Sequence, residues 1–98
     1  MKAVFLSPAL AEMAEAAQFY ESRQAGLGHQ FLDALDRAVE DVEQNPQRWP
    51  VLKKQVRRRL VGRFPYGILY RIEEGRQEIT IVAIMHLCRR PNYWTKRI

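Results

Sequence analysis

The chain has 98 residues, of which 47% are hydrophobic and 28% charged, and its formal net charge is +5. This length predicts one domain over residues 1–98, because two separate cores would each be too small to be stable. The hydrophobic fraction excludes a disordered chain, whose apolar surface could not offset the loss of chain entropy. The single cysteine, Cys88, excludes an intrachain disulfide and favours a reducing compartment.

The longest apolar run spans residues 79–85 and is far shorter than the ~20 residues that cross a bilayer. The first residues also lack the apolar stretch of a signal peptide. We therefore expect a cytoplasmic protein with no membrane partner.

The first predicted elements are a short strand and a helix. Residues 2–6 alternate as in a strand, and Ser7-Pro8 is typical of an N-cap followed by proline at the first helical position. The apolar stripe of this helix leaves Glu12 and Glu15 on the face expected to contact solvent.

A second helix follows the glycines at positions 26 and 28 and stops at Asn45-Pro46. Its apolar residues recur at three- and four-residue spacing: Leu27, Phe31, Leu35, Val39 and Val42. The short glycine loop between two apolar stripes predicts an antiparallel helical hairpin.

Three strands are predicted in the second half of the chain, over residues 56–63, 66–72 and 78–86. Residues 47–55 are expected to form a loop, and residues 73–76 a hairpin turn in which Gly75 supplies a positive φ. The nearly apolar third strand is expected inside the sheet, and the tail (residues 89–98) to form one helical turn. The order β-α-α-β-β-β predicts an α+β fold, with a helical hairpin packed on a small curved antiparallel sheet and a short C-terminal tail.

Charge is divided unevenly along the chain. Residues 1–47 carry three Lys or Arg and eight Asp or Glu, whereas residues 48–98 carry thirteen and three, so the halves have net charges of −5 and +10. This asymmetry indicates an anionic partner for the second half, either a phosphate backbone or an acidic protein segment.

The sequence shows no metal-binding or cofactor-binding pattern. His29 and His86 lie far apart and no histidine or cysteine pair has ligand spacing, so we expect no metal and no cofactor. Strand alternation places Arg57 and Arg59 on one face and Arg58 on the other.

The C-terminal basic residues are interleaved with Tyr93 and Trp94. Such a mixture suits nucleic acid, through phosphate contacts and stacking, and it also suits a docking groove for an acidic peptide. Alternatively, Tyr93 and Trp94 form a C-terminal lid packed on the sheet.

Several stretches resemble the RelE/ParE toxin superfamily, the toxins of bacterial type II toxin–antitoxin modules: FPYGILYR at residues 64–71, IVAIMH at 81–86 and RRPNYW at 89–94. The resemblance extends over the helical hairpin and so covers nearly the whole chain. It implies a small toxin that an antitoxin neutralises by wrapping around the hairpin and the sheet, and that meets operator DNA only through this antitoxin. The antitoxin contacts that the resemblance implies here are Phe19, Tyr20, Arg58, Tyr66 and Tyr70.

The superfamily contains two activities. RelE-like members are ribosome-dependent mRNA endonucleases and commonly carry an arginine where this chain has Gly67, so the chain resembles the ParE-like members, which inhibit DNA gyrase, more closely. The ParE-like reading implies target contacts by Arg89, Arg90, Tyr93, Trp94 and Arg97, with no catalytic residue. The alternative nuclease reading would use Arg57, Arg59, His86, Arg89 and Tyr93. A third reading is a non-toxic corepressor that binds operator DNA with its antitoxin.

Overall fold

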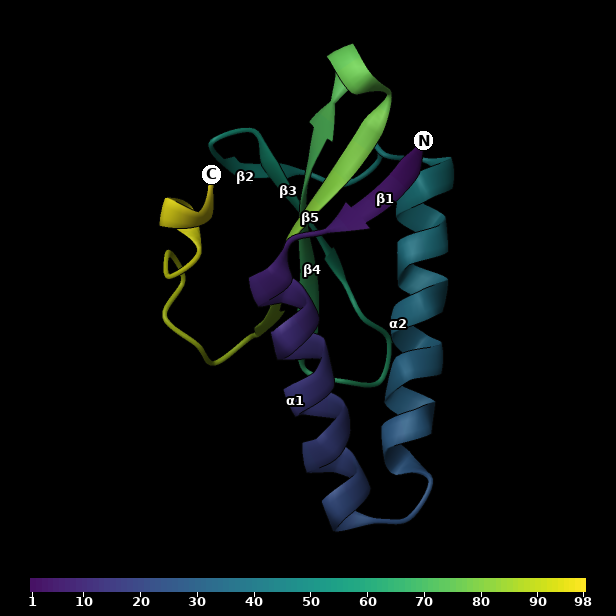
Figure 1. Ribbon diagram of the computed structural model, residues 1–98. Helices are drawn as coiled ribbons and strands as arrows, with labels where there is room; N and C mark the ends of the chain where they lie inside the picture. Colours follow the sequence, from purple (N-terminus) through teal and green to yellow (C-terminus); the bar gives the residue numbers. More distant parts are fainter.

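A computed structural model describes all residues, 1–98, and places two helices on one face of a five-stranded sheet (Figure 1). The fold is α+β, as predicted. In chain order the elements are β1 (Lys2–Phe5), α1 (Ser7–Arg23), α2 (Leu27–Gln44), β2 (Val51–Lys53), β3 (Val56–Leu60), β4 (Tyr66–Glu73) and β5 (Glu78–His86). The chain also contains two short 3-10 turns, Glu74–Arg76 between β4 and β5 and Thr95–Arg97 in the tail.

The strand order is β1-β5-β4-β3-β2, and β1 runs parallel to β5 while all other pairs are antiparallel. The expectation of a wholly antiparallel sheet was therefore wrong for β1. Apolar alternation defines which face of a strand is buried but carries no information about the direction of its neighbour.

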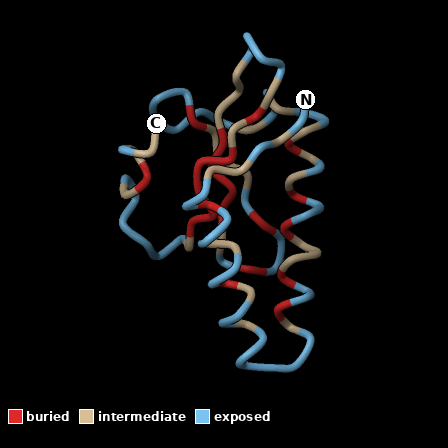
Figure 2. The backbone as a smooth tube through the Cα atoms, in the orientation of Figure 1, coloured by how far each residue is buried: buried red, intermediate tan, exposed pale blue.

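The sheet separates two hydrophobic cores, and its central strands are buried on both faces (Figure 2). The larger core lies under the helices, where Phe31, Leu35 and Tyr70 are buried. The smaller core lies on the opposite face, where the tail covers Leu69 and Val82. As predicted, β5 is an interior strand that supplies residues to both cores.

The hairpin of α1 and α2 is closed by glycines and a carboxylate. Gly26 precedes α2 with φ of 88°, a left-handed conformation that glycine adopts without strain. Glu21, near the end of α1, accepts hydrogen bonds from the backbone N–H groups of Gly26 (3.0 Å) and Gly28 (3.1 Å). It thereby satisfies donors that the first turn of α2 leaves unpaired.

Gly28 allows α2 to approach the backbone of α1 closely. A Cβ atom there would lie 2.5 Å from the Ala17 carbonyl oxygen. We expect Gly28→Ala to lower the free energy of unfolding by about 2 kcal/mol, because rigid backbone must move, and to lower the melting temperature by about 4–8 °C per kcal/mol.

Gly75→Ala is the matched control for this prediction, since a Cβ atom at Gly75 meets nothing within 4 Å. It should change the free energy of unfolding by less than about 0.5 kcal/mol in thermal or urea denaturation. Equal melting temperatures for the two variants would contradict the close approach at Gly28.

Three local features differ from expectation. The N-cap of α1 is Leu6, so Ser7 is already helical. Residues 51–53 form β2, not a loop: β2 is exposed, so its sequence has no apolar alternation, and the turn to β3 uses positive φ at Lys54 and Gln55 instead of the usual glycine or asparagine. Gly75 does not have the predicted positive φ; Gln77 does, at 53°.

The helices of this structure are not candidates for bilayer crossing, because neither combines sufficient length with an apolar enough sequence.

Candidate target-binding surface

The candidate surface begins at an uncovered edge of β5. β1 pairs with β5 only as far as Ile81, so the backbone of the following residues has no strand on that side. Two side chains take over this edge: Glu12 of α1 accepts the Ile84 N–H at 3.0 Å, and Arg97 of the tail donates to the Val82 carbonyl oxygen at 3.0 Å. The backbone groups of β5 that no strand pairs with, in a partly buried position, are thus satisfied by one side chain from α1 and one from the tail.

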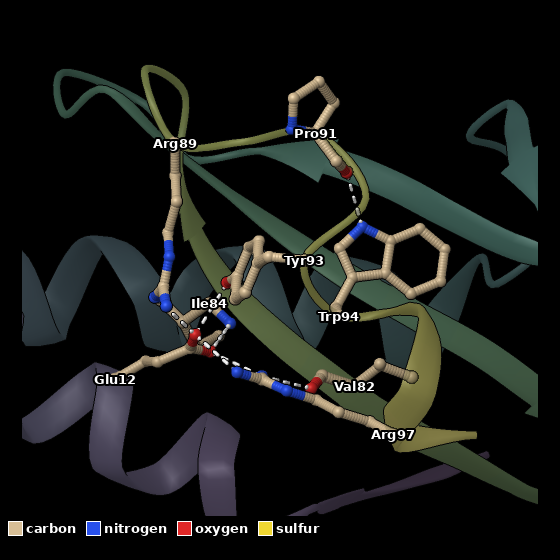
Figure 3. A network of polar contacts seen from close by, with 8 residues as sticks. All are labelled: Glu12, Val82, Ile84, Arg89, Pro91, Tyr93, Trp94 and Arg97. Carbon is tan, nitrogen blue, oxygen red and sulfur yellow. Dashed lines mark hydrogen bonds and ion pairs between the residues drawn. The ribbon is translucent and has the colours of Figure 1, made fainter.

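The Glu12 carboxylate is the centre of a polar network (Figure 3). Arg97 donates to both of its oxygens at 2.9 Å in a bidentate pair, Tyr93 Oη donates at 2.6 Å and Arg89 at 3.1 Å. The Glu12 side chain is only 11% exposed. The prediction that Glu12 contacts solvent was therefore wrong, because the tail covers the part of α1 on which it lies.

Tyr93 lies against two guanidinium groups. The Cζ atom of Arg89 is 3.8 Å from the ring centroid and that of Arg97 is 4.9 Å from it. Burial and the hydrogen bond to Glu12 raise the pKa of Tyr93 well above 10.0. Burial also raises the pKa of Glu12, but the hydrogen bonds from Arg97, Tyr93 and the Ile84 backbone outweigh it and hold this pKa below 4.5.

These shifts predict a stability plateau with two edges. The lowered pKa of Glu12 contributes stability that is present above pH 4.5 and is lost as the pH falls through the folded-state value. The raised pKa of Tyr93 contributes stability that is present below pH 10.0 and is lost as the pH rises through its folded-state value.

Thermal unfolding of the chain and of Glu12→Gln checks the acid edge. The difference in melting temperature should be largest near neutral pH and shrink as the pH falls from about 4.5 towards 2, since protonation makes the glutamate as uncharged as glutamine. A difference that stays constant down to pH 2 would contradict the lowered pKa.

Trp94 anchors the tail on the smaller core. Its side chain is 1% exposed and its Nε1–H donates to the Pro91 carbonyl oxygen at 2.9 Å. Trp94 therefore packs on the sheet, as in the alternative prediction that Tyr93 and Trp94 form a C-terminal lid. Trp94 does not offer its side chain to a target in this structure, which corrects its place among the expected contact residues.

The segment between β5 and Trp94 is exposed, and we call residues 87–92 the basic loop. It carries Arg89, whose side chain is 52% exposed, and the exposed Arg90. Its start is fixed by two hydrogen bonds, from Leu87 N–H to the Pro65 carbonyl oxygen and from Cys88 N–H to His86 Nδ1. Both ends of the loop are therefore held, while Arg90 is exposed and the partly exposed guanidinium of Arg89 bridges the loop to Glu12. Among the other expected contact residues, Tyr93 and Arg97 lie behind it in the Glu12 network.

The residues of the nuclease reading do not form one site. Arg57 donates to the carbonyl oxygens of Gln47 and Trp49, and Arg59 pairs with Asp41 of α2 at 2.5 Å. His86 and Arg89 instead line a groove beside α1. β4 separates β3 from β5, which places Arg59 about 10 Å or more from His86 across the sheet.

The expected antitoxin contacts are distributed unevenly. Phe19 is 49% exposed, and with Tyr66 it lines the same groove, of about 260 Å³, between α1 and the end of β5. Tyr20 is half-buried and packs edge-on against Phe64, with ring centroids 4.9 Å apart. Tyr70 is fully buried, with its hydroxyl bonded to the Pro46 carbonyl oxygen, so it is a core residue and not a surface contact.

Arg58 lies on the tail side of the sheet, over Gly67. A Cβ atom at Gly67 would come within 3.2 Å of both Cγ and Cδ of Arg58. The aliphatic part of Arg58 therefore occupies the space above this glycine, where a larger residue would displace it.

Sequence reasoning missed Glu12 as the centre of this surface. The helical period correctly predicts α1, but it cannot show that a tail more than seventy residues away packs on the face opposite α2. A weak signal exists, since Glu12 is an acidic residue in a chain whose tail is strongly basic.

Comparisons with known proteins agree with this architecture. The family model described as "ParE toxin of type II toxin-antitoxin system, parDE" matches residues 4–90. A solved structure titled "Chromosomal ParDE TA system from P. aeruginosa" superposes with a TM-score of 0.75 and 18% sequence identity, covering 89% of this chain and 96% of that chain. A search of curated proteins found no match. The family match spans most of the fold, including β5 and the start of the basic loop, and the chain therefore belongs to the family of ParE toxins of type II toxin–antitoxin systems.

Proposed function

We propose that this toxin inhibits DNA gyrase by binding to it, without catalysing a reaction of its own, and that a cognate antitoxin neutralises it. The observation that carries the proposal is the basic loop, which exposes Arg89 and Arg90. The loop is held at its start by the bond from Leu87 to Pro65 and after its end by the buried Trp94. A basic loop whose backbone is held at both ends suits an acidic protein surface, because little backbone conformational entropy is lost on binding.

Binding is favoured over mRNA cleavage by the distribution of cations. In-line attack on a phosphate needs positive charge and a proton-transfer group at one place. Here Arg57 and Arg59 are engaged on the helix side of β3, while His86 Nδ1 already accepts the Cys88 N–H. Gly67 also stands where RelE-like toxins commonly have an arginine. These features together support a binding toxin.

The groove between α1 and β5 suits the antitoxin. Phe19 and Tyr66 supply apolar surface there, and Arg89 also lines the groove. A segment that fills the groove and carries an acidic residue would pair with Arg89 and cover the basic loop. Neutralisation then follows because the antitoxin surface, the groove, overlaps the target surface, the basic loop. Operator DNA would be reached only through the antitoxin.

Production of the protein in growing cells without an antitoxin tests the proposal. We expect growth arrest with DNA breaks bound to gyrase and with translation initially intact, and relief when the antitoxin is supplied. Rapid loss of translation with cleaved mRNA would support a RelE-like nuclease. Unaffected growth would support the corepressor reading, in which the protein binds operator DNA only with its antitoxin.

A further inference from the structure

The tail is attached to the domain almost entirely through side chains. Its backbone hydrogen bonds join residues only three apart, as from Arg97 N–H to the Trp94 carbonyl oxygen, and no strand pairs with it. Its connections to the rest of the molecule are the buried Trp94 with apolar contacts of Tyr93 and Ile98 in the smaller core, a bond from Lys54 Nζ to the Thr95 carbonyl oxygen at 3.0 Å, and the network around Glu12 and β5.

Glu12 is the one carboxylate bonded to the tail, and it reaches three of its residues. Arg89 stands at the start of the tail, Tyr93 near its middle and Arg97 near its end, and all three donate to the same carboxylate. The carboxylate also accepts the Ile84 N–H, so it ties these residues directly to the sheet. One side chain on α1 therefore fixes the tail relative to β5 along most of its length.

We infer that Glu12 is a positioning residue, which holds the tail against β5 and thereby presents the basic loop to the target. Its effect on gyrase rests on the proposed function, whereas the dependence of tail docking on Glu12 does not. Glu12 is not expected to contact the target, because its carboxylate is already surrounded by five donors and its side chain is nearly buried.

A neutral side chain cannot replace this carboxylate. Glutamine would direct an NH₂ group towards donors, which leaves some of them unpaired. It would also remove the negative charge between Arg89 and Arg97, both of which lie against the Tyr93 ring. The tail would then lose charge-assisted hydrogen bonds, the strongest of its polar attachments.

The experiment compares Glu12→Gln with Glu15→Gln in the free protein. Glu15 is the matched control because it is an exposed glutamate on the same helix that makes no hydrogen bond or ion pair. Amide exchange by NMR reports on the Ile84 and Arg97 N–H groups, and acrylamide quenching of fluorescence reports on tryptophan exposure, with Trp49 unaffected by the change.

In Glu12→Gln we expect amide exchange at Ile84 and Arg97 to accelerate by about 10- to 100-fold, the factor that corresponds to losing a hydrogen bond to a charged group. Tryptophan quenching should increase, while the amides of α2 keep their protection. Glu15→Gln should resemble the unmodified chain in every measurement. Unchanged exchange at Ile84 and Arg97 in Glu12→Gln would overturn the inference.

Arg97→Gln provides a second route in case Glu12→Gln does not fold, because it removes the bidentate pair from the tail side and leaves α1 intact. It should also accelerate exchange at the Ile84 amide, although Ile84 does not contact Arg97 in the hydrogen-bond network. Where both variants fold, the effects of the two changes should be less than additive in the double variant, because both remove the bidentate Glu12–Arg97 pair, although Arg97→Gln also removes the bond to Val82. Additive effects would show that Glu12 and Arg97 act independently and would overturn the inference.

Inhibition of purified gyrase completes the test. A Glu12→Gln variant with a released tail should inhibit at least about tenfold less than Glu15→Gln, since a mobile loop loses its preorganisation. A released tail with full inhibition would overturn the positioning role. If the unmodified chain itself does not inhibit gyrase, the proposed function fails, and the exchange measurements still decide whether Glu12 holds the tail.

Discussion

Toxicity is expected to disappear when Arg89 and Arg90 are both replaced by alanine. The two guanidinium groups are the exposed charges of the basic loop, and loss of two arginine contacts at an interface costs about 2–4 kcal/mol, or a 30- to 1000-fold loss of affinity. The measurement is colony formation after production of the variant without an antitoxin. A double variant that arrests growth like the unmodified toxin would show that the target surface lies elsewhere.

The control for this prediction is the double variant Lys53→Ala, Arg76→Ala. It also removes two positive charges, but from exposed positions in β2 and in the turn before β5, so the net charge changes by the same amount. This variant should remain toxic. The Arg89–Glu12 pair is exposed on the arginine side, so its loss should cost less than about 1 kcal/mol of stability, and melting curves can confirm that the Arg89→Ala, Arg90→Ala variant folds.

Trp94→Ala should produce the largest loss of stability among single substitutions in the tail. Trp94 is fully buried in the smaller core, and truncating a buried tryptophan costs about 3–5 kcal/mol. For a domain of this size the melting temperature should fall by at least about 12 °C. Differential scanning calorimetry measures the change directly.

Trp94→Phe separates packing from hydrogen bonding in the same core. Phenylalanine keeps most of the apolar contact and loses the Nε1 bond to Pro91, so we expect a cost of about 1–2 kcal/mol. A Trp94→Ala variant that melts within about 2 °C of the unmodified chain would mean that the tail is not docked on the sheet, and it would also undermine the role inferred for Glu12.

The elements with strong local patterns could be predicted from the sequence. The three- and four-residue spacing of apolar residues in α2 and the nearly continuous apolar run of β5 each indicate one element type, and the observed bounds of β5 are those predicted. The parallel direction of β1 and the exposed strand β2 had no such pattern, because pairing direction depends on the path of the whole chain and β2 buries no face.

The site was only partly predictable for a related reason. The motif around residues 89–94 indicates the tail as the candidate site, but it does not distinguish an exposed side chain such as Arg90 from a buried one such as Trp94. Neither does it show that Glu12 faces the tail. These properties arise from contacts between segments at opposite ends of the chain, which periodicity within one segment cannot describe.

The most direct test of the central claim is a supercoiling assay with purified gyrase and the purified toxin, run beside the Arg89→Ala, Arg90→Ala variant. If the basic loop of this ParE-family toxin binds gyrase, the toxin should block supercoiling and accumulate cleaved DNA, and the double variant should do neither. Full supercoiling activity in the presence of excess folded toxin would contradict the account.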